Sequence, residues 1–444
     1  MNLEIPMPPP RPRRARGGTF LATFTVHLTV VTPILGGGAQ TRATDDVDVI
    51  RAPTARGHLR FWWRALTGHE FGSSQDLYAA ESALWGRAAG DEGGRSAVEL
   101  RVDVEQAGEI DQSDIRLYDS REGMATPGAY ALWPARGERR SQTPAPRRKP
   151  GTRFRLTALA PAEREAEVRN TVRAWVLFGG YSSRTRRGVG SLGVRIEPNA
   201  WVPAAATREG FTTLFGRDIF APPRTVAGSV PWLAGASLHV GRAEKHAETA
   251  WTTALEWLKE FRQGTQGTVG NRAREPGAGK PQPQRPSISN WPEADKVRHL
   301  TGKTKAHPPR HNDRPAWPRA GFGLPIIGKF QENARNGGRL DEPDGFELRW
   351  RSGGEEHDRL ASPLIVKALP LANGTFVPCA LWLNRAYPPG EVVLRGVPGS
   401  GAPFDRLVAP GDAAGFAALA GKTSLREAFL DWLHAKHHTT IVAP

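Results

Sequence analysis

The segment from Val31 to Leu66 constrains this chain more than any other. It runs from an apolar strand through Gly36 to Gly38 and an acidic loop into a helix with arginines at four-residue spacing. Side chains four apart share one helix face, so Arg56, Arg60 and Arg64 are predicted to form one cationic stripe. Glycines lack a Cβ and let a bulky ligand approach the main chain closely. The segment therefore predicts a surface that contacts phosphate groups.

The overall charge favours the same class of partner. The 444 residues include 60 lysines and arginines and 45 aspartates and glutamates, which gives a formal net charge of +15. Such a surplus attracts polyanions and releases counterions from nucleic acid. An anionic membrane surface competes as a partner, but the sequence has neither an apolar run of about 18 residues nor a basic amphipathic helix with a broad apolar face. We therefore expect nucleic acid, and no membrane.

The cysteine content and the first residues indicate the compartment. Cys379 is the one cysteine, which excludes an intramolecular disulfide framework and a cysteine-based metal cluster. Residues 1–17 are rich in arginine and proline, with no apolar segment after them of the kind a secretory signal contains. We expect a loose basic arm on a protein of the reducing cytoplasm.

The chain is long for one core, so two domains are expected. In residues 18–202 the predicted order is strand, helix, strands, helix, strand, which is the βαββαβ plan of a ferredoxin-like domain. The strands are expected at 19–31, 97–104, 129–133 and 153–158, and the helices at 54–66 (N-capped by Thr54), 74–87 and 162–178.

Residues 203–444 repeat this plan less clearly. Strands are expected at 235–240, 347–351, 364–369, 377–384 and 392–395, and helices at 248–262 and 424–437. Residues 263–319 are rich in Pro, Gly, Gln, Arg and Lys, and most of this stretch is predicted to be a mobile basic insertion. The predicted fold class is α+β, with two ferredoxin-like (RRM-like) domains in tandem.

A second glycine-rich element follows the helix that ends at Phe178. In residues 179–193 the sequence GGYSSRTRRGVGSLG combines flexible backbone with three arginines, which suits a loop that holds a nucleic-acid backbone. The alternative is an ordinary glycine-capped turn with solvated arginines. The loop lacks the lysine and Ser/Thr of a P-loop and follows a helix rather than a strand, so ATP binding is not expected.

Three segments carry a family resemblance: TPILGGGA, IRAPTARGHLRFWWRAL and WVLFGGYSSRTRRGVGSL, with FGLPI at Phe322 to Ile326 and RLASPLIVK at Arg359 to Lys367. Together they resemble the RAMP superfamily of CRISPR proteins, and within it the first subunit of type III-B (Cmr) effector complexes. The resemblance implies two ferredoxin-like domains and a subunit that binds guide and target RNA near the 3′ end of the guide. It also implies other Cmr subunits as partners, especially a neighbouring RAMP subunit, and a subunit that is not the one cutting the target.

The candidate RNA-binding residues come from both glycine-rich elements and the arginine helix, which are expected to line a single basic groove. Trp62 and Trp63 lie about 100° apart on that helix, so one of them is expected either to be exposed, where it could stack on a base, or to lie against the second domain. The full set is Gly36, Gly37, Gly38, Arg42, Arg51, Arg56, His58, Arg60, Trp62, Trp63, Arg64, Gly179, Gly180, Ser182, Arg184, Arg186, Arg187, Gly188 and Gly190.

Two other functions compete with non-catalytic RNA binding. Asp45, Asp46 and Asp48 lie in the loop where slicing relatives carry their aspartate, and clustered carboxylates can bind a divalent metal that activates a 2′-hydroxyl. The alternative is therefore a metal-dependent RNA endonuclease. The third possibility is a scaffold that contacts proteins alone. For the preferred function we expect no catalytic residue, no resident metal and no cofactor.

Overall fold

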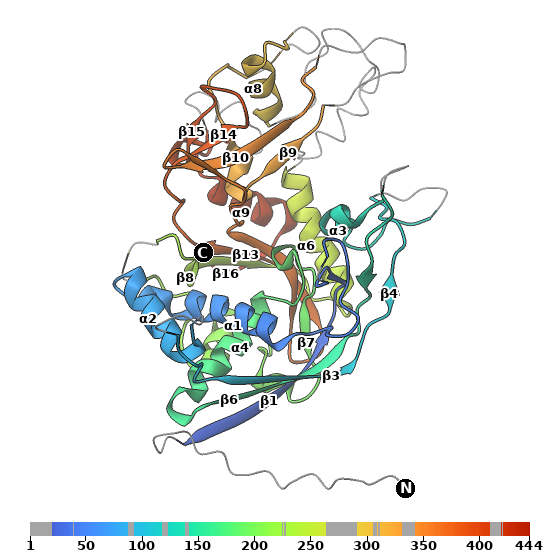
Figure 1. Cartoon of the computed structure of the whole chain (residues 1–444), viewed down its shortest axis with the longest axis vertical. Helices are drawn as coiled ribbons and strands as arrows, with labels where there is room; N and C mark the ends of the chain where they lie inside the picture. The colour runs from blue at the N-terminus through green and yellow to red at the C-terminus, as the bar shows by residue number, and fades with distance from the viewer. Residues whose placement is uncertain are drawn as a thin grey trace.

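The computed structural model describes residues 20–38, 40–87, 93–117, 123–137, 142–223, 225, 228–262, 291–304, 309, 311–330, 342–408, 419 and 421–444. Its class is mixed α and β with several antiparallel sheets, as expected (Figure 1). None of the described helices is long and apolar enough to cross a membrane.

The first half of the chain forms a four-stranded antiparallel sheet in the order β3-β6-β1-β7. Its central pair aligns Val26 with Leu156 and Leu28 with Phe154, so alternating apolar residues of both strands face one side. The strands are β1 (Leu21–Val30), β3 (Glu99–Gln106), β6 (Arg153–Pro161) and β7 (Leu192–Val194), and the helices are α1 (Ala52–Thr67), α2 (Ser74–Trp85), α4 (Glu165–Phe178) and α5 (Arg208–Phe215).

The second half forms another four-stranded antiparallel sheet, in the order β12-β13-β8-β16. Along the chain, its elements follow the same succession of strand, helix, two strands, helix and strand as those of the first sheet. The strands are β8 (Trp232–Val240), β12 (Leu364–Pro370), β13 (Phe376–Asn384) and β16 (Thr440–Ala443), and the helices are α6 (Ala247–Arg262) and α9 (Leu425–His437).

Helices α1 and α4 lie between the two sheets (Figure 1). One core cluster joins Val26 and Phe154 of the first sheet, Trp62 and Trp175 of the two helices, and Leu238 of the second sheet. The other face of the second sheet packs against α6 and α9 in a separate cluster. Because both faces are covered, β12 is buried along its whole length.

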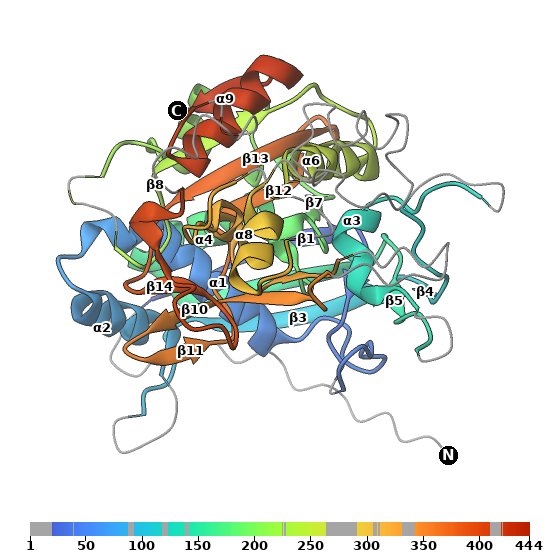
Figure 2. The ribbon, with the colours of Figure 1, turned by 90° about the horizontal axis from the view of Figure 1, so that it is seen from above.

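A lobe with its own small core extends beyond α6 and α9 at one end of the molecule (Figures 1 and 2). Its sheet has the path β11-β10-β14-β15, with β9 also paired to β10. The bounds are α8 (Glu293–Leu300), β9 (Ile326–Gly328), β10 (Phe346–Ser352), β11 (Glu355–His357), β14 (Glu391–Leu394) and β15 (Ala402–Pro403). A third small sheet contains β2 (Ile34–Leu35), β5 (Arg147–Arg148) and β4 (Ile110–Asp111).

Part of the predicted mobile insertion belongs to this lobe. Residues 263–290 lie outside the described residues. Trp317, by contrast, is fully buried and donates to the Ser400 carbonyl, and Trp291 packs edge-on against Phe261 with ring centroids 5.7 Å apart. The prediction covered most of this stretch and stays a prediction for its undescribed part. At its end, a few aromatic residues build a core that average composition hides.

Two predictions of local secondary structure were wrong. The segment 129–133 is not a strand but the short helix α3 (Ala129–Leu132) followed by a 3-10 turn (Trp133–Ala135). A short apolar run fits either structure, and here the helix packs against α6. Helix α1 begins at Ala52 with Arg51 as its N-cap, not Thr54, because Pro53 favours the first turn of a helix.

Candidate nucleic-acid interface

A cleft of about 800 Å³ opens where the glycine-rich loop after α4 meets segments of the second half. Five arginines line it, together with aromatic and aliphatic residues. No aspartate or glutamate is among the described residues of its wall. The lining residues are Tyr130, Trp133, Pro134, Arg184, Arg186, Arg187, Arg262, Phe322, Gly323, Leu324, Pro325, Ile327, Arg359, Leu360 and Ser362.

A short 3-10 turn at residues 185–187 directs two of these arginines, Arg186 and Arg187, across the boundary between the halves. Arg186 donates to the Ser362 carbonyl at 2.6 Å, and Arg187 donates to the Leu364 carbonyl at 2.9 Å. Arg184 has a left-handed backbone (φ 62°), which is unusual for a residue other than glycine, and it donates to the Ala131 carbonyl. The loop is therefore fixed by its own arginines.

The electrostatics of the cleft favour an anionic ligand. Burial, and then the nearby Arg262, lower the pKa of Arg187 to about 9; burial and Arg385 lower the pKa of Arg186 to about 10. Within the described parts of the chain, Arg262 and Arg359 form no ion pair, although Arg262 lies over the Phe322 ring. Cations that lie close together without carboxylates repel one another, so a bound phosphate would stabilise them strongly.

The structure brings the two glycine-rich stretches together. The Ser182 hydroxyl accepts a hydrogen bond from Leu35 N–H at 2.9 Å and donates to the Leu35 carbonyl, directly before Gly36. The Gly190 N–H donates to the Pro33 carbonyl, and Thr32 donates to the Gly188 carbonyl. The two segments are thus neighbours in space, although Leu35 and Ser182 are 147 residues apart in sequence.

The glycines of the second loop, however, make room for protein rather than for RNA. A Cβ on Gly188 would lie 2.5 Å from the Trp251 ring, and one on Gly179 would lie 2.4 Å from the Trp62 indole nitrogen. Gly180 and Gly190 are similarly crowded by neighbouring carbonyl groups. The expectation that these glycines admit a ligand backbone was wrong, because tight tertiary packing has the same sequence signature.

The first glycine stretch is more open. Gly37 is exposed and has a positive φ of 112°, and a Cβ added at this position would have no neighbouring atom within 4 Å. Gly36 lies beside Ser183, and Gly38 is held against the Ala43 carbonyl in a turn. Arg51 donates to the Gly37 carbonyl at 2.7 Å, so its charge stays close to this bare main chain.

The arginine stripe of α1 does not face the cleft. Arg60 and Arg64 both donate to the buried carboxylate of Glu81 on α2, and Arg56 donates to the Val98 carbonyl. Successive residues turn by about 100°, which puts Arg60 and Arg64 about 160° from Trp62, the side chain that meets the glycine loop. The predicted single groove between this stripe and the loop was wrong.

We therefore expect Arg60 and Arg64 to matter for stability and not for RNA binding. In the double variant Arg60→Met/Arg64→Met, Glu81 stays buried without its cationic partners, which should cost about 2 kcal/mol of unfolding free energy. Urea denaturation measures this loss. RNA affinity should be measured at a temperature about 20 °C below the melting temperature of the variant, where it is folded. It should stay within about twofold of wild type. A drop of about tenfold would show that the stripe contacts RNA.

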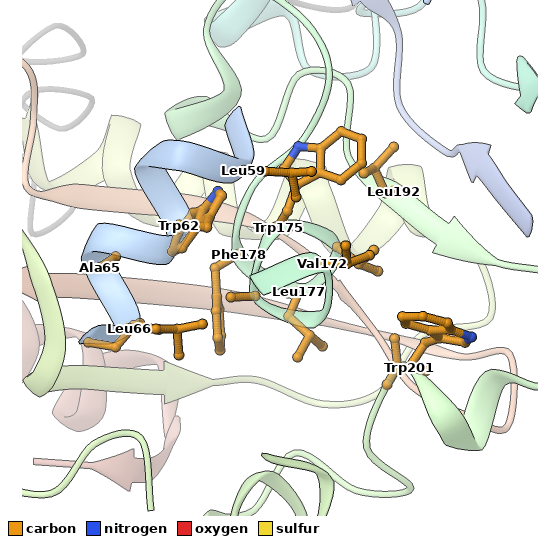
Figure 3. Packing of buried hydrophobic residues seen from close by; sticks show 14 of the residues in the cluster. Leu59, Trp62, Ala65, Leu66, Val172, Trp175, Leu177, Phe178, Leu192 and Trp201 are labelled. Carbon is orange, nitrogen blue, oxygen red and sulfur yellow. The ribbon is translucent and has the colours of Figure 1, made fainter. Parts of the chain in front are cut away.

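Neither tryptophan of α1 is exposed. Trp62 is 2% and Trp63 1% exposed, because α1 is covered by the second sheet, α2 and α4. Figure 3 shows Trp62 beside Phe178 of α4, and their ring centroids are 5.9 Å apart. Trp63 donates to Glu167. The expectation that one ring is exposed was wrong, since the helix is packed on more than one side. The contact of α1 with β8 of the second half fits the other expectation.

His58 and Arg42 also have internal partners. His58 stacks on Trp175 and meets the edge of Tyr181, and burial lowers its pKa to about 4, so the ring is neutral at pH 7. Arg42 donates to the carbonyls of Pro134, Arg136 and Thr143. Its role in this structure is to hold the turn after α3.

The three aspartates of the acidic loop do not converge on a site. Asp46 pairs with Arg148 at 2.7 Å, while Asp45 accepts the backbone N–H groups of Val47 and Asp48, and these hydrogen bonds lower the pKa of Asp45. Among the described residues no group of three or more His, Cys, Asp or Glu could hold a metal ion. This geometry gives the endonuclease alternative no support.

Sequence reasoning missed Arg262, Arg359, Tyr130 and Trp133. Arg262 closes α6, and Arg359 begins the segment RLASPLIVK, which was noticed for its family resemblance but not as a source of cleft residues. Nothing in the local sequence shows that Arg262 and Arg359 line the same cleft as Arg184, because the fold of the second half brings them there.

Comparison with known proteins finds a similarity in the first half of the chain. Residues 27–193, from β1 to β7, match the model of the RAMP superfamily. The matched range contains both glycine-rich stretches and three of the cleft arginines.

A particular relative is the CRISPR system Cmr subunit Cmr1-1 of Pyrococcus furiosus. It is 26% identical over 152 residues, which are 34% of this chain and 41% of the relative, so the match spans less than half of that protein. The solved structure of Cmr1 from Pyrococcus furiosus in its apo form is also similar, with a TM-score of 0.49, 15% identity, and coverage of 96% of this chain and 99% of that one. A chain of the type III-B Cmr-beta complex bound to cognate target RNA has a TM-score of 0.43 and 11% identity, with coverage of 82% and 94%.

Proposed function

We propose that this protein is a non-catalytic RNA-binding subunit of a type III-B CRISPR (Cmr) effector complex. The observation that carries the proposal is the cleft between the halves, which gathers five arginines and no described carboxylate. The RAMP match over residues 27–193 and the likeness to a Cmr subunit support the same class of protein.

The cleft would act on the RNA backbone. Guanidinium groups of Arg262 and Arg359 would neutralise phosphates, while Arg186 and Arg187 add positive potential from behind. Such contacts hold any sequence alike, and base pairing between guide and target would supply specificity. The partners in this proposal are guide and target RNA near the 3′ end of the guide, a neighbouring RAMP subunit and other Cmr subunits in the cytoplasm.

The domain organisation belongs to the same proposal. The orders β3-β6-β1-β7 and β12-β13-β8-β16 support two ferredoxin-like domains in tandem, assigned to residues 18–202 and 203–444. A basic arm at 1–17 lies outside the described residues. The lobe around α8 and β10 would be an elaboration of the second domain between its first helix and second strand, extended by residues 391–407.

Direct RNA binding by the purified full chain tests the proposal. Fluorescence anisotropy with labelled single-stranded RNA should show binding that weakens as salt rises. In Arg262→Gln/Arg359→Gln, we expect affinity near 0.1 M salt to fall about 30-fold, because two phosphate contacts are lost. The slope of log affinity against log salt should fall by about 1.4.

A matched control removes the same charge elsewhere. Arg95→Gln/Arg406→Gln also lowers the net charge by two, at side chains that are 84% and 76% exposed and do not line the cleft. This variant should bind RNA within about threefold of wild type. Equal losses in both double variants would mean that net charge alone attracts RNA, and the cleft would lose its assignment.

A further inference from the structure

Trp133 combines exposure with a place at the edge of the arginine cleft. It is 36% exposed, whereas Trp62, Trp63, Trp175 and Trp251 are buried. The same cleft is lined by Ile327, which is 70% exposed, and by Pro325, both from the second half. A partly exposed aromatic ring beside cations and aliphatic side chains is an arrangement that can accept an unpaired base.

The turn that carries Trp133 is held in place from two sides. Arg42 donates to the carbonyls of Pro134 and Arg136, which follow Trp133 in the same turn. Arg184 donates to the Ala131 carbonyl, two residues before it. Both arginines have left-handed backbones, with φ of 66° and 62°. A ring fixed in this way pays little conformational entropy when a ligand stacks on it.

Charge also surrounds the ring. The Arg136 guanidinium lies over the Trp133 ring at 4.2 Å from its centroid, and Arg184 shares the cleft with it. A nucleotide needs a flat apolar surface for its base and a cation for its phosphate, and the cleft offers both within one volume of about 800 Å³.

We infer that Trp133 is a base-stacking residue, and that the cleft takes one unpaired nucleotide of a single-stranded RNA, with its base on the indole and its phosphate on the arginines. This inference rests on the proposed function and adds a subsite to it. The subsite is expected to accept any base, because every base has a stacking face.

The test compares ordinary single-stranded RNA with an abasic ribose-phosphate oligomer of equal length. We expect Trp133→Ala to lower affinity for RNA about tenfold and to leave the salt slope unchanged, since no phosphate contact is removed. The abasic oligomer should bind wild type and Trp133→Ala equally. Trp133→Phe should retain most of the affinity, because it keeps a stacking ring. Tyr78→Ala is the control, since Tyr78 is 51% exposed on α2 and does not line the cleft.

The outcomes separate this inference from the function on which it rests. If Trp133→Ala binds RNA as tightly as wild type, or loses the same factor for RNA and for the abasic oligomer, base stacking on Trp133 is wrong. In that case Arg262→Gln/Arg359→Gln would still lose affinity if the proposed function holds. If wild type binds neither oligomer, the proposed function fails and the subsite with it.

Discussion

Replacing Trp251 by alanine should lower the free energy of unfolding by about 3–5 kcal/mol. Trp251 lies on α6 of the second half, is fully buried and packs against two glycines of the first half. A Cβ on Gly128 would lie 2.0 Å from its ring and one on Gly188 2.5 Å from it, and its indole N–H donates to the Arg187 carbonyl at 2.6 Å. The substitution opens a cavity between the halves. Chemical denaturation monitored by circular dichroism measures the loss.

A double-mutant cycle shows whether this contact works as the structure indicates. In the wild-type background, Gly188→Ala should cost about 2–4 kcal/mol, because the methyl group meets the ring and the backbone has a φ of 71°. In the Trp251→Ala background the clash with the ring is gone, and the cost should fall toward the backbone penalty of about 1 kcal/mol plus the close approach of the methyl group to Lys367 Cα, 3.0 Å away. Additive costs would show that Gly188 and Trp251 do not touch. Since Arg187 is held by the same indole, Trp251→Ala should also weaken RNA binding.

The second large effect concerns Lys367, a lysine of β12 with no exposed surface. Its ammonium donates to the carbonyls of Val176 and Gly179 at 3.1 and 2.7 Å, which are among the unpaired carbonyls at the end of α4. Burial lowers the pKa of Lys367 to about 7. It also raises the pKa of Cys379, its partner across the β12–β13 ladder, to about 12. A neutral amine still has two hydrogens to donate, so both contacts survive deprotonation.

This depressed pKa predicts a stability that rises with pH. Below pH 7 Lys367 is protonated in both states, so pH has no effect through this group. Above pH 7 the folded protein releases the proton while the unfolded chain, with a pKa of 10.5, keeps it. The unfolded state then binds more protons, and the unfolding free energy should rise by about 2 kcal/mol between pH 7 and pH 9.

Lys367→Met isolates this contribution. We expect the stability of wild type relative to the variant to increase by that amount from pH 7 to pH 9, because all other titrating groups are shared. Urea midpoints of both proteins across this range give the measurement. Curves that stay parallel would mean that Lys367 keeps its ordinary pKa.

Much of the fold follows from local patterns. The alternation of β1 and the amphipathic spacing of α4 and α6 placed these elements within a few residues of their observed bounds. The predicted strand at 129–133 was wrong because a run of five residues fits both periods. The packing at the end of residues 263–319 could not be predicted, because Trp291 and Trp317 have their partners far away in the chain.

The candidate site was predicted only in part. Arg184, Arg186 and Arg187 line the cleft, as a glycine- and arginine-rich loop suggests. The spacing of Arg56, Arg60 and Arg64 correctly predicted that these side chains share one helix face. It could not predict what this face contacts, because Glu81, which pairs with two of the arginines, lies on another helix. A glycine that admits Trp251 is indistinguishable in sequence from one that admits a phosphate.

The sequence by itself determined the positive charge, the class of fold and the RAMP-like segments, because charge, hydrophobic period and motif spacing are properties of neighbouring residues. Only the tertiary structure decided which arginines remain available. An arginine is paired when a carboxylate or carbonyl oxygen comes within about 3 Å of its guanidinium group. Sheet order and the packing of the two halves decide which oxygens do so. The hydrogen bond from Arg187 to the Leu364 carbonyl, for example, joins residues that are 177 positions apart in sequence.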